Sequence, residues 1–400
     1  SNLKQLADCI SRNHQYSGEK QLFIDVSSLV KIDSKSGIQR VVKSILKELL
    51  ENPPAGYRIE PVYSTVEEYG YKYARNFTYD FLSYPLQDNR ENLIDFKQGD
   101  IFLGLDLSPI VISKVEFYKI LKSFGVKTYF IIYDILPIIH PEWWTENICE
   151  IHTKWLETVL NISDSVISIS KAVSYEVKDW VNKKDIKKNI PLEYKYFHLG
   201  ADVKNSMPSK GLLNDTNVVL DKLKSKISFL SVGTIEPRKG HKQTILAFEK
   251  LWSKNIDVNL VIVGKLGWLM DDFASKVRNH PERNKRLFWL EGISDEYLEK
   301  VYETSTCLIA ASEGEGFGLP LIEAAQHKKP IIARDIPVFK EVAKEFAYYF
   351  ENTNEANVLC KAIKEWLELY KDDKHPKSQN MPWLTWQEST KILLDKILIP

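Results

Sequence analysis

The chain has 400 residues, of which 44% are hydrophobic and 27% are charged, and its 54 basic residues balance its 54 acidic ones. This length exceeds one ordinary hydrophobic core and predicts a globular protein of two domains, each of about 200 residues. Zero net charge excludes a global attraction to nucleic acid or to an anionic membrane.

The cysteines and the apolar stretches indicate a cytoplasmic protein. The four cysteines are scattered and form no C-x-x-C pair, so we expect reduced thiols and neither disulfides nor a zinc site; they are Cys9, Cys149, Cys307 and Cys360. No apolar stretch has the length of a membrane helix, and the N-terminus lacks a signal-peptide pattern. We therefore expect membrane contact, where it occurs, to be local and peripheral.

The first predicted elements form one unit of a doubly wound domain. Residues 21–26 (QLFIDV) predict a strand, and residues 38–50 predict a helix because their apolar side chains recur at helical spacing. Ser36 is placed to cap this helix, and Gly37 then serves the turn. A strand, a loop and a helix in this order are typical of a parallel α/β sheet.

Residues 51–100 are rich in tyrosine and predict an irregular segment. Its tyrosines either face an acceptor sugar or pack together at a loop-rich edge. Residues 100–105 (DIFLGL) and 127–133 (KTYFIIY) then predict buried strands, which end at Asp106 and Asp134. Carboxylates at the carboxyl ends of parallel strands lie along the ligand crevice of such sheets.

A strand at residues 165–170, between helices at residues 152–160 and 171–180, continues the alternation. The basic cluster that follows either meets lipid phosphates or is solvated; it comprises Lys183, Lys184, Lys187 and Lys188. Residues 203–226 are polar, are punctuated by Pro208, Gly211 and Asn214, and predict a linker. We place the domain boundary there, which gives domains at residues 1–203 and 204–400.

The second half begins with a strand at residues 227–232, a loop at residues 233–240 (GTIEPRKG) and a helix at residues 241–252. Two adjacent cations in this loop suit a diphosphate, with Arg238 as a bidentate fork and Lys239 as a point charge. The alternative is that both are surface charges near a helix start. Strands at residues 259–263 and 286–290 follow, and Ser294 is placed to cap the next helix.

The stretch at residues 312–324 (SEGEGFGLPLIEA) is the one around which the chain is organised. It follows an apolar strand and precedes a helix, so its glycines allow backbone N–H groups to approach an anion at the helix N-terminus. Glu315 and Glu323 are repelled by phosphate and are therefore candidates for binding sugar or ribose hydroxyls. The alternative is an ordinary tight connection with a solvated acidic rim.

This stretch resembles the paired-glutamate motif of the retaining family 4 glycosyltransferases, and the resemblance extends over nearly the whole chain from about Leu22. It implies that Glu315 contacts the donor sugar and that Glu323 contacts the ribose of the nucleotide. Residues 233–240 resemble the diphosphate-binding loop of the family, although other relatives carry arginine where this chain has Thr234. Residues 36–42 resemble its N-terminal loop, in which a glycine, here Gly37, approaches the phosphates. Residues 196–202 (YFHLGAD) resemble its last strand before the interdomain linker.

The resemblance also assigns the remaining site residues. Residues 133–144 (YDILPIIHPEWW) resemble a family signature that often begins with His-Asp, so Tyr133 and Asp134 are catalytic candidates together with Glu315. His140 is interpreted as a loop residue and not as a catalytic base. The donor-binding candidates beyond Arg238, Lys239, Glu323 and Gly37 are Gly233, Gly292, Ile293, Gly316, Phe317, Gly318 and Leu319, of which Gly292 and Ile293 are assigned to the nucleobase.

The family implies a GT-B fold, in which two doubly wound Rossmann-like domains face a central cleft and the last helix crosses back to the first domain. It also implies transfer with retention of anomeric configuration. No D-x-D pair occurs in the sequence, so we expect no metal and no cofactor, with Arg238, Lys239 and helix amides neutralising the leaving group.

Among members of the family, the motif sequences of this chain are most similar to those of bacterial mannosyltransferases, which use GDP-mannose to build surface glycans such as O-antigen. The expected partners are the sugar nucleotide and a glycan or lipid-linked glycan acceptor, without nucleic acid. The expected location is the cytoplasm, with peripheral contact at the inner face of the plasma membrane or with a polysaccharide-assembly complex.

The sequence offers three alternatives to that donor and activity. The same fold is compatible with dTDP-rhamnose or UDP-glucose as donor. Because Tyr133 and Thr234 depart from the common pattern, a non-catalytic sugar-nucleotide-binding domain of a larger polysaccharide-synthesis protein is a second alternative. A dinucleotide oxidoreductase is disfavoured, since no G-x-G-x-x-G follows an early strand.

Overall fold

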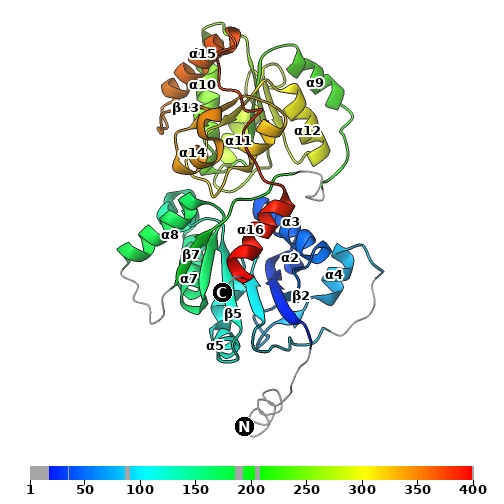
Figure 1. The fold of residues 1–400 in the computed structure, drawn as a ribbon. Helices are drawn as coiled ribbons and strands as arrows, with labels where there is room; N and C mark the ends of the chain where they lie inside the picture. Colours follow the sequence, from blue (N-terminus) through cyan, green and yellow to red (C-terminus); the bar gives the residue numbers. More distant parts are fainter. Residues whose placement is uncertain (1–17, 35, 86–90, 185–191, 203–207, 399–400) are drawn as a thin grey trace. The chain divides into compact units, whose positions relative to one another are not determined.

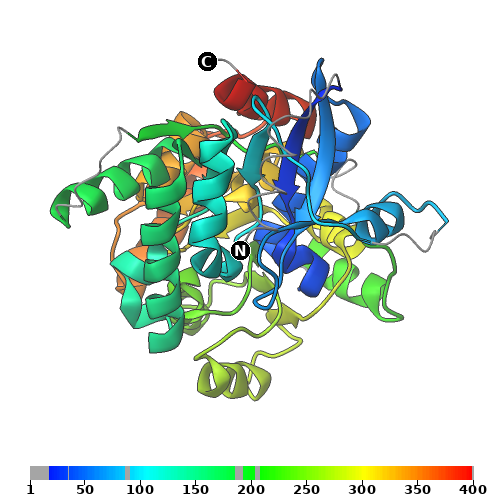
Figure 2. The same ribbon diagram turned by 90° about the horizontal axis from the view of Figure 1, so that it is seen from below.

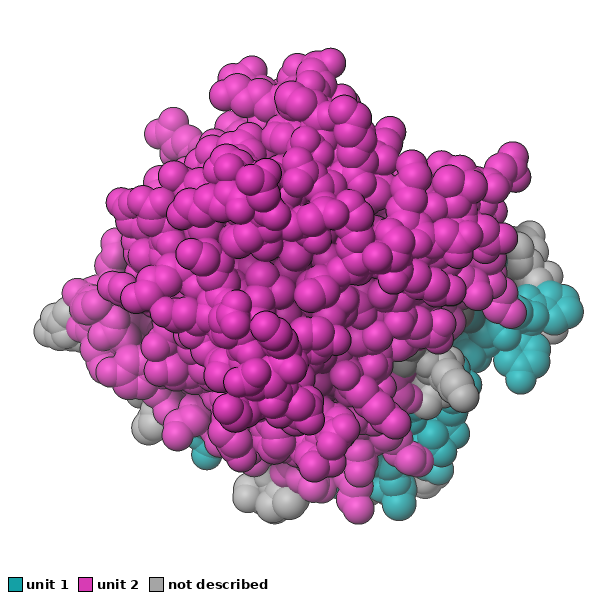
Figure 3. All heavy atoms as spheres, turned by 90° about the horizontal axis from the view of Figure 1, so that it is seen from above, with its two compact units in different colours: residues 1–131, 155–166, 188–193 teal, residues 132–154, 167–187, 194–400 magenta. Residues whose placement is uncertain are grey.

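The computed structural model describes residues 18–34, 36–85, 91–184, 192–202 and 208–398 (Figure 1). The chain divides into two compact units, which Figure 3 colours separately. Unit 1 comprises residues 1–131, 155–166 and 188–193, and unit 2 comprises residues 132–154, 167–187 and 194–400. The predicted boundary at residue 203 adjoins residues 203–207, which lie outside the described residues, and stays a prediction.

Within the described residues, the first sheet has the strand order β3-β2-β1-β4-β5-β6-β7. Its strands are β1 (Lys20–Asp25), β2 (Tyr57–Tyr63), β3 (Lys72–Tyr73), β4 (Ile101–Gly104), β5 (Lys127–Ile132), β6 (Ser165–Ser168) and β7 (Glu193–Tyr196). β1 pairs in parallel with β2 and with β4, and β1 and β2 lie side by side in both ribbon views (Figure 1, Figure 2). β4 also pairs in parallel with β5, as a doubly wound sheet requires, whereas β2 and β3 are antiparallel.

The helices before residue 203 alternate with these strands. They are α2 (Ser27–Lys31), α3 (Gly37–Glu51), α4 (Arg75–Phe81), α5 (Val115–Ser123), α6 (Leu136–Ile139), α7 (Glu146–Ile162) and α8 (Lys171–Lys183), with 3₁₀ turns at Pro109–Lys114 and Pro141–Trp143. α3 forms as predicted: its apolar face is buried, and the Ser36 side chain accepts a hydrogen bond from the Gln39 N–H at 3.3 Å.

The predicted irregular segment at residues 51–100 was wrong in part, because Tyr57–Tyr63 forms β2. Pro61 lies inside this strand opposite Ile24 of β1. A proline has no N–H to donate and reads as a strand breaker, which hid the strand in the sequence. Of the tyrosines, Tyr71 is fully buried, with its ring centroid 4.9 Å from that of Phe102. Packing in the core therefore accounts for the position of the Tyr71 side chain.

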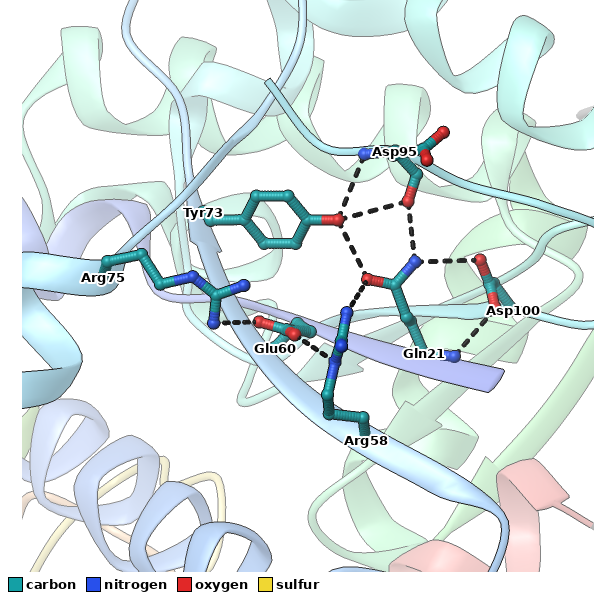
Figure 4. Close-up of polar contacts among 7 residues, drawn as sticks. All are labelled: Gln21, Arg58, Glu60, Tyr73, Arg75, Asp95 and Asp100. Carbon is teal, nitrogen blue, oxygen red and sulfur yellow. Dashed lines mark hydrogen bonds and ion pairs between the residues drawn. The ribbon is translucent and has the colours of Figure 1, made fainter. Parts of the chain in front are cut away.

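The Gln21 side chain of β1 links the edge strand β3 to the segment before β4 (Figure 4). Its amide donates to the Asp95 carbonyl at 2.7 Å, and its oxygen accepts from Tyr73 at 2.9 Å. The Asp100 carboxylate accepts from the Gln21 backbone N–H at 2.7 Å. Beside this network, buried Glu60 pairs with two arginines, Arg58 and Arg75. These polar contacts lie at the amino end of β1, opposite the carboxyl ends that carry Asp106 and Asp134.

The second sheet has the order β10-β9-β8-β11-β12-β13 within the described residues, and neighbouring strands pair in parallel. Its strands are β8 (Ser228–Val232), β9 (Asn259–Val263), β10 (Leu287–Leu290), β11 (Cys307–Ala310), β12 (Ile331–Arg334) and β13 (Tyr348–Phe350). The order reverses between β8 and β11, so the chain has a topological switch point there.

Helices cover this sheet as the predicted alternation required. They are α9 (Thr216–Lys224), α10 (His241–Ser253), α11 (Asp271–Arg278), α12 (Asp295–Thr304), α13 (Leu319–Gln326), α14 (Pro337–Ala343) and α15 (Ala356–Lys371), with 3₁₀ turns at Pro237–Lys239 and Lys344–Phe346. One core cluster includes Phe229, Phe248 and the fully buried Trp366, whose ring lies 5.5 Å from that of Phe229.

The last helix, α16 (Trp386–Leu398), packs against the segment after β7. The Trp386 N–H donates to the Asp202 carboxylate at 2.6 Å, and the Ser389 hydroxyl donates to the His198 carbonyl at 2.7 Å. A strand was predicted at residues 196–202, but β7 ends at Tyr196. The following residues accept contacts from α16, with an isolated bridge between Gly200 and Leu384.

Three features of the described residues bear on the predicted partners and metals. Cys149, Cys307 and Cys360 are free, and Cys9 lies outside the described residues, as do Lys187 and Lys188 of the basic cluster. None of the described helices combines the length and the apolar character needed to cross a membrane. Across the described residues, no group of three or more His, Cys, Asp and Glu side chains is placed to hold a metal ion.

Candidate active site

The glycine-rich turn between β11 and α13 packs closely against the segment that follows β5. A Cβ atom on Gly316 would lie 2.2 Å from the Tyr133 carbonyl oxygen, and one on Gly314 would lie 3.0 Å from the Trp143 ring. The Ser170 hydroxyl donates to the Gly316 carbonyl at 2.8 Å. A larger residue at position 316 would therefore displace backbone, so the glycine fixes the path of the turn.

The backbone conformation at the end of this turn allows α13 to begin. Gly318 has a φ of 98°, the left-handed region that favours glycine, and a proline follows within the first helical turn. The Phe317 side chain is only 4% exposed, and its ring lies 5.5 Å from that of His198. Of the predicted donor-binding residues here, Phe317 thus has its side chain in the core, and its backbone remains the part available to a ligand.

Glu315 is held by both cations of the loop after β8. Its two carboxylate oxygens lie 2.9 Å from Arg238 Nη1 and 2.5 Å from Lys239 Nζ. Arg238 Nη1 also donates to the Gly314 carbonyl at 2.8 Å, and Arg238 Nη2 lies 2.7 Å from Glu236 Oε1. Three residues predicted separately, Glu315, Arg238 and Lys239, are thus brought into one ion-paired cluster.

The electrostatics of this cluster depend on burial and on charge. Burial raises the pKa of Glu315, but the charges of Lys239 and Arg238 more than offset this effect and hold the pKa at about 2. Burial also raises the pKa of Glu236, against the opposing effect of Arg238 and Lys239. Glu315 is therefore a carboxylate at neutral pH, and the two cations are positioned by it.

Three loops converge at the carboxyl ends of β8, β9 and β11. A Cβ atom on Gly240, whose φ is 71°, would lie 2.2 Å from the Ala311 carbonyl oxygen, and one on Gly264 would lie 1.9 Å from the Gly233 carbonyl oxygen. A small cavity of about 20 Å³ lies here and is lined by Lys239 and Glu315 among others. This is the switch point of the sheet, where open α/β sheets bind ligands.

Asp134 and Tyr133 lie on the other side of the turn within unit 2. Asp134 Oδ1 accepts a hydrogen bond from the Leu136 N–H at 3.1 Å, which orders the start of α6. His152 of α7 lies against the Asp134 carbonyl, with its Nε2 at 3.2 Å. The negative charge of Asp134 contributes to raising the pKa of Arg238. The Tyr133 side chain is 3% exposed, so its carbonyl, which faces Gly316, is the part at the turn.

The second glutamate has a different environment from the first. Glu323 of α13 is 5% exposed and accepts a hydrogen bond from the Tyr302 hydroxyl of α12 at 2.8 Å. The predicted contact of Glu323 with ribose stays a prediction.

The remaining predicted donor residues are glycines and their neighbours. Gly292 has a φ of 62° and precedes Ile293 and the Ser294 cap of α12. Gly37 begins α3 in unit 1, and a Cβ atom there would meet nothing within 4 Å. Gly37, Gly292 and Ile293 stay predictions as ligand contacts.

The sequence analysis did not identify three titratable side chains of unit 2. Glu236 precedes Arg238 by two residues in the GTIEPRKG loop, so its position was visible although its ion pair was not. Burial lowers the pKa of His152 of α7, whose Nε2 lies against the Asp134 carbonyl, and burial raises the pKa of Glu176 of α8 to about 7. No motif marks His152 or Glu176, because their burial results from the packing of the helices.

The arrangement combines a cation pair, a carboxylate and the N-terminal end of α13. Arg238 and Lys239 are suited to an anion that carries two or more phosphate oxygens. A preorganised group of this kind also stabilises negative charge that develops on a leaving group.

The known sequences that match this chain are described as glycosyltransferases. Residues 216–381 match the sequence family described as "Glycosyl transferases group 1". The chain is 42% identical over 400 residues to the serotype-specific mannosyltransferase WbdA of Escherichia coli, which covers 98% of this chain and 48% of WbdA. It is 25% identical over 224 residues to the O-antigen chain mannosyltransferase RfbU of Salmonella typhimurium, 56% of each chain. The chain spans about half the length of the first of these curated relatives.

Solved structures share the fold at low identity. The sucrose-phosphate synthase of Thermosynechococcus elongatus superposes with a TM-score of 0.66 at 14% identity, over 94% of this chain and 98% of that one. HepE of Anabaena, solved in complex with UDP, gives a TM-score of 0.58 at 14% identity, over 94% of this chain and 95% of that one. At this identity the likeness establishes the fold, which is the GT-B fold that the sequence predicted.

Proposed function

We propose, from the premise that the chain carries a glycosyltransferase domain of group 1 at residues 216–381, that it transfers a mannosyl residue from a sugar nucleotide to a growing bacterial surface glycan. The best candidate for the donor is GDP-mannose, and the best candidate for the product is an O-antigen chain. The support for mannose is the function of the relatives, of which WbdA is a mannosyltransferase at 42% identity.

One observation carries the catalytic part of the proposal. The Glu315 carboxylate is clamped by Arg238 and Lys239 at 2.9 and 2.5 Å, at the carboxyl ends of the second sheet. In the bound state we expect the diphosphate to take over contacts with the two cations, because phosphate oxygens match their charge. Glu315 is then released toward the sugar, where its charge stabilises the positive anomeric carbon.

The proposed reaction retains the anomeric configuration. The bond between the anomeric carbon and the β-phosphate oxygen breaks, and its electron pair stays with the nucleoside diphosphate. The acceptor hydroxyl oxygen forms the new bond on the same face, and its proton passes to the departing phosphate oxygen. Arg238, Lys239 and the amides at the start of α13 neutralise the leaving group, so the proposal needs no metal ion.

The acceptor in this proposal is a glycan or lipid-linked glycan. Its support is the similarity to RfbU, an O-antigen chain mannosyltransferase. The proposed location is the cytoplasm, with peripheral contact at the inner face of the plasma membrane or with a polysaccharide-assembly complex.

The experiment that tests the proposal measures sugar transfer by the purified chain in EDTA. GDP-mannose, UDP-glucose and dTDP-rhamnose are offered in turn with mannosylated oligosaccharide acceptors. We expect transfer from GDP-mannose, and we expect Glu315→Gln to lower turnover more than tenfold, since electrostatic groups of this kind contribute a few kcal/mol. The matched control is Glu313→Gln, because Glu313 lies on the same turn and its carboxylate accepts from Asn354.

Each outcome of that assay decides a part of the proposal. Transfer from another donor would replace mannose, and activity that requires added magnesium would contradict the metal-independent mechanism. Near-normal turnover of Glu315→Gln would remove Glu315 from the site. Binding of a sugar nucleotide without transfer or hydrolysis would favour the alternative of a non-catalytic sugar-nucleotide-binding domain.

A further inference from the structure

A second, larger cavity lies at the amino ends of β11 and β12. Its volume is about 460 Å³, and its lining includes Thr306, directly before β11, and Pro330, directly before β12. The cavity beside Glu315 lies at the carboxyl end of β11, and among the described residues the two cavities share no lining residue. The glycine-rich turn and the segment that lines the larger cavity are joined by α13, whose eight residues span about 12 Å. The larger cavity is therefore distinct from the candidate active site.

The wall of this cavity is held in place by a hydrogen bond and by ring packing. The Ser378 hydroxyl donates to the Lys329 carbonyl at 2.6 Å, which joins the segment after α15 to the segment before β12. His375 is 6% exposed, and its ring lies 5.0 Å from that of Tyr370 and 5.6 Å from that of the buried Trp366. The cavity is therefore built on ordered side chains, as binding pockets usually are.

The charged residues of the lining are mostly cations. Lys328, Lys329 and Lys377 line the cavity together with one carboxylate, that of Asp373, which pairs with Lys377. His375 adds no charge at neutral pH, because burial lowers its pKa. The excess positive charge thus belongs to Lys328 and Lys329. A concave site with charges of one sign attracts a ligand of the opposite sign, here an anion.

The ammonium group of Lys329 is suited to such an anion. Nζ donates to the Glu303 backbone carbonyl at 2.8 Å. An ammonium group has three N–H donors, and a carbonyl carries no net charge to balance it. Burial lowers the pKa of Lys329, although the negative charge of the Glu303 carboxylate acts against this effect. A phosphate oxygen beside Nζ would supply both a balancing charge and a further acceptor.

The hydroxyl groups of the lining favour a ligand that also has hydroxyl groups. Thr304, Ser305 and Ser378 donate their hydroxyl protons to backbone carbonyls at 2.6, 2.7 and 2.6 Å. A hydroxyl has one proton and two lone pairs, so these oxygens remain acceptors. Thr306 differs, because its oxygen accepts from the Ser228 N–H at 3.1 Å and its proton is not used in that contact. Acceptors beside ammonium groups match a molecule that combines hydroxyl groups with an anionic group.

We propose that this cavity is a binding site for a sugar that carries a phosphate group. Lys328 and Lys329 bind the phosphate, and the oxygens of Thr304 and Ser378 accept hydrogen bonds from the sugar hydroxyls. The volume of about 460 Å³ lies in the usual range of small-molecule sites, and it exceeds what a phosphate ion fills. The ligand is either a free sugar phosphate or the phosphorylated end of a saccharide chain. Binding here does not depend on the proposed glycosyl transfer.

Calorimetric titration of mannose 6-phosphate into the full chain tests this site. We expect saturable binding to wild type and binding at least about tenfold weaker to Lys329→Ala and to Lys328→Ala, because each loses a charge-assisted contact. The matched control is Lys374→Ala, since Lys374 is 70% exposed, pairs with Asp372 at 3.2 Å and does not line the cavity. Lys239→Ala should also bind as wild type does, because Lys239 lines the other cavity.

Further probes identify the part of the ligand that is recognised. Inorganic phosphate and mannose should each bind more weakly than mannose 6-phosphate. Tighter binding of a mannose oligosaccharide with a terminal 6-phosphate supports a chain end as the ligand, and equal binding supports a free sugar phosphate.

Three results would overturn the proposal. They are no binding of mannose 6-phosphate to wild type, equal affinity for inorganic phosphate and mannose 6-phosphate, and a loss in Lys239→Ala as large as that in Lys329→Ala. Melting temperatures show whether the variants are folded. Lys328 is exposed, so Lys328→Ala keeps the test decisive if Lys329→Ala folds poorly.

Discussion

At the scale of single residues, the guanidinium of Arg238 joins three partners through two nitrogens that are held in a fixed planar geometry. Its Nη1 reaches both the Glu315 carboxylate and the Gly314 carbonyl, and its Nη2 reaches Glu236. The side chains of Arg238 and Glu236 are 13% and 4% exposed, so water replaces these contacts poorly. A planar fork of fixed geometry therefore sets the position of Glu315.

We expect Arg238→Lys to destabilise the fold although it keeps the charge. One ammonium group cannot reach both carboxylates and the carbonyl, and a buried acceptor left unpaired costs about 1 to 3 kcal/mol. Urea unfolding measures this cost as a lower midpoint with an unchanged slope.

The matched control is Arg278→Lys, since Arg278 also meets a carboxylate with two contacts, to Glu291, but is 48% exposed. An exposed pair of this kind contributes less than about 1 kcal/mol. Equal losses in the two variants would mean that burial of the Arg238 cluster has no energetic consequence.

At the scale of elements, the site is built by the close approach of loops rather than by any one loop. The glycine-rich turn lies against the segment after β5 at Gly316, and the loop after β8 lies against the end of β11 at Gly240. Backbone meets backbone at both places, and a side chain cannot fit between them. The close backbone contacts at these glycines thus set the positions of Glu315 and Arg238.

Gly316→Ala tests this packing. Its Cβ would lie 2.2 Å from the Tyr133 carbonyl oxygen, so we expect backbone displacement, a loss of roughly 1 to 3 kcal/mol of unfolding free energy and reduced transfer. The melting temperature and turnover are measured together.

The control for stability is Gly37→Ala, where the Cβ would meet nothing within 4 Å. That variant should unfold within about 0.5 kcal/mol of wild type, as substitutions without new contacts usually do. Equal melting temperatures for all three proteins would contradict the packing argument.

At the scale of the whole molecule, the alternation of strands and helices was predictable because apolar runs and helical spacing depend on local sequence. β8, β9 and β10 lie within a residue of the predicted ranges, and β11 and α13 flank the glycine-rich stretch as predicted. The GT-B fold was predictable for the same reason, together with the resemblance of the motifs.

The failures have physical causes. β2 was missed because Pro61 lacks the N–H that a strand pattern assumes. The strand at residues 196–202 was expected from the resemblance to the family, but the residues after Tyr196 instead contact α16. The pairing of Glu315 with Arg238 spans 77 positions and is set by tertiary packing, so local sequence carries no sign of it. Glu176 has no motif and was invisible for the same reason.

The central claim is that Arg238 and Lys239 hold the diphosphate of a sugar nucleotide without a metal ion. The measurement that tests it most directly is calorimetric titration of GDP into the full chain in EDTA, with wild type and Lys239→Ala compared. We predict saturable binding to wild type and binding at least about tenfold weaker to the variant, because a lost charge-assisted contact costs about 1.4 kcal/mol or more. Equal affinity in both proteins, or binding that appears only with added magnesium, would contradict the claim.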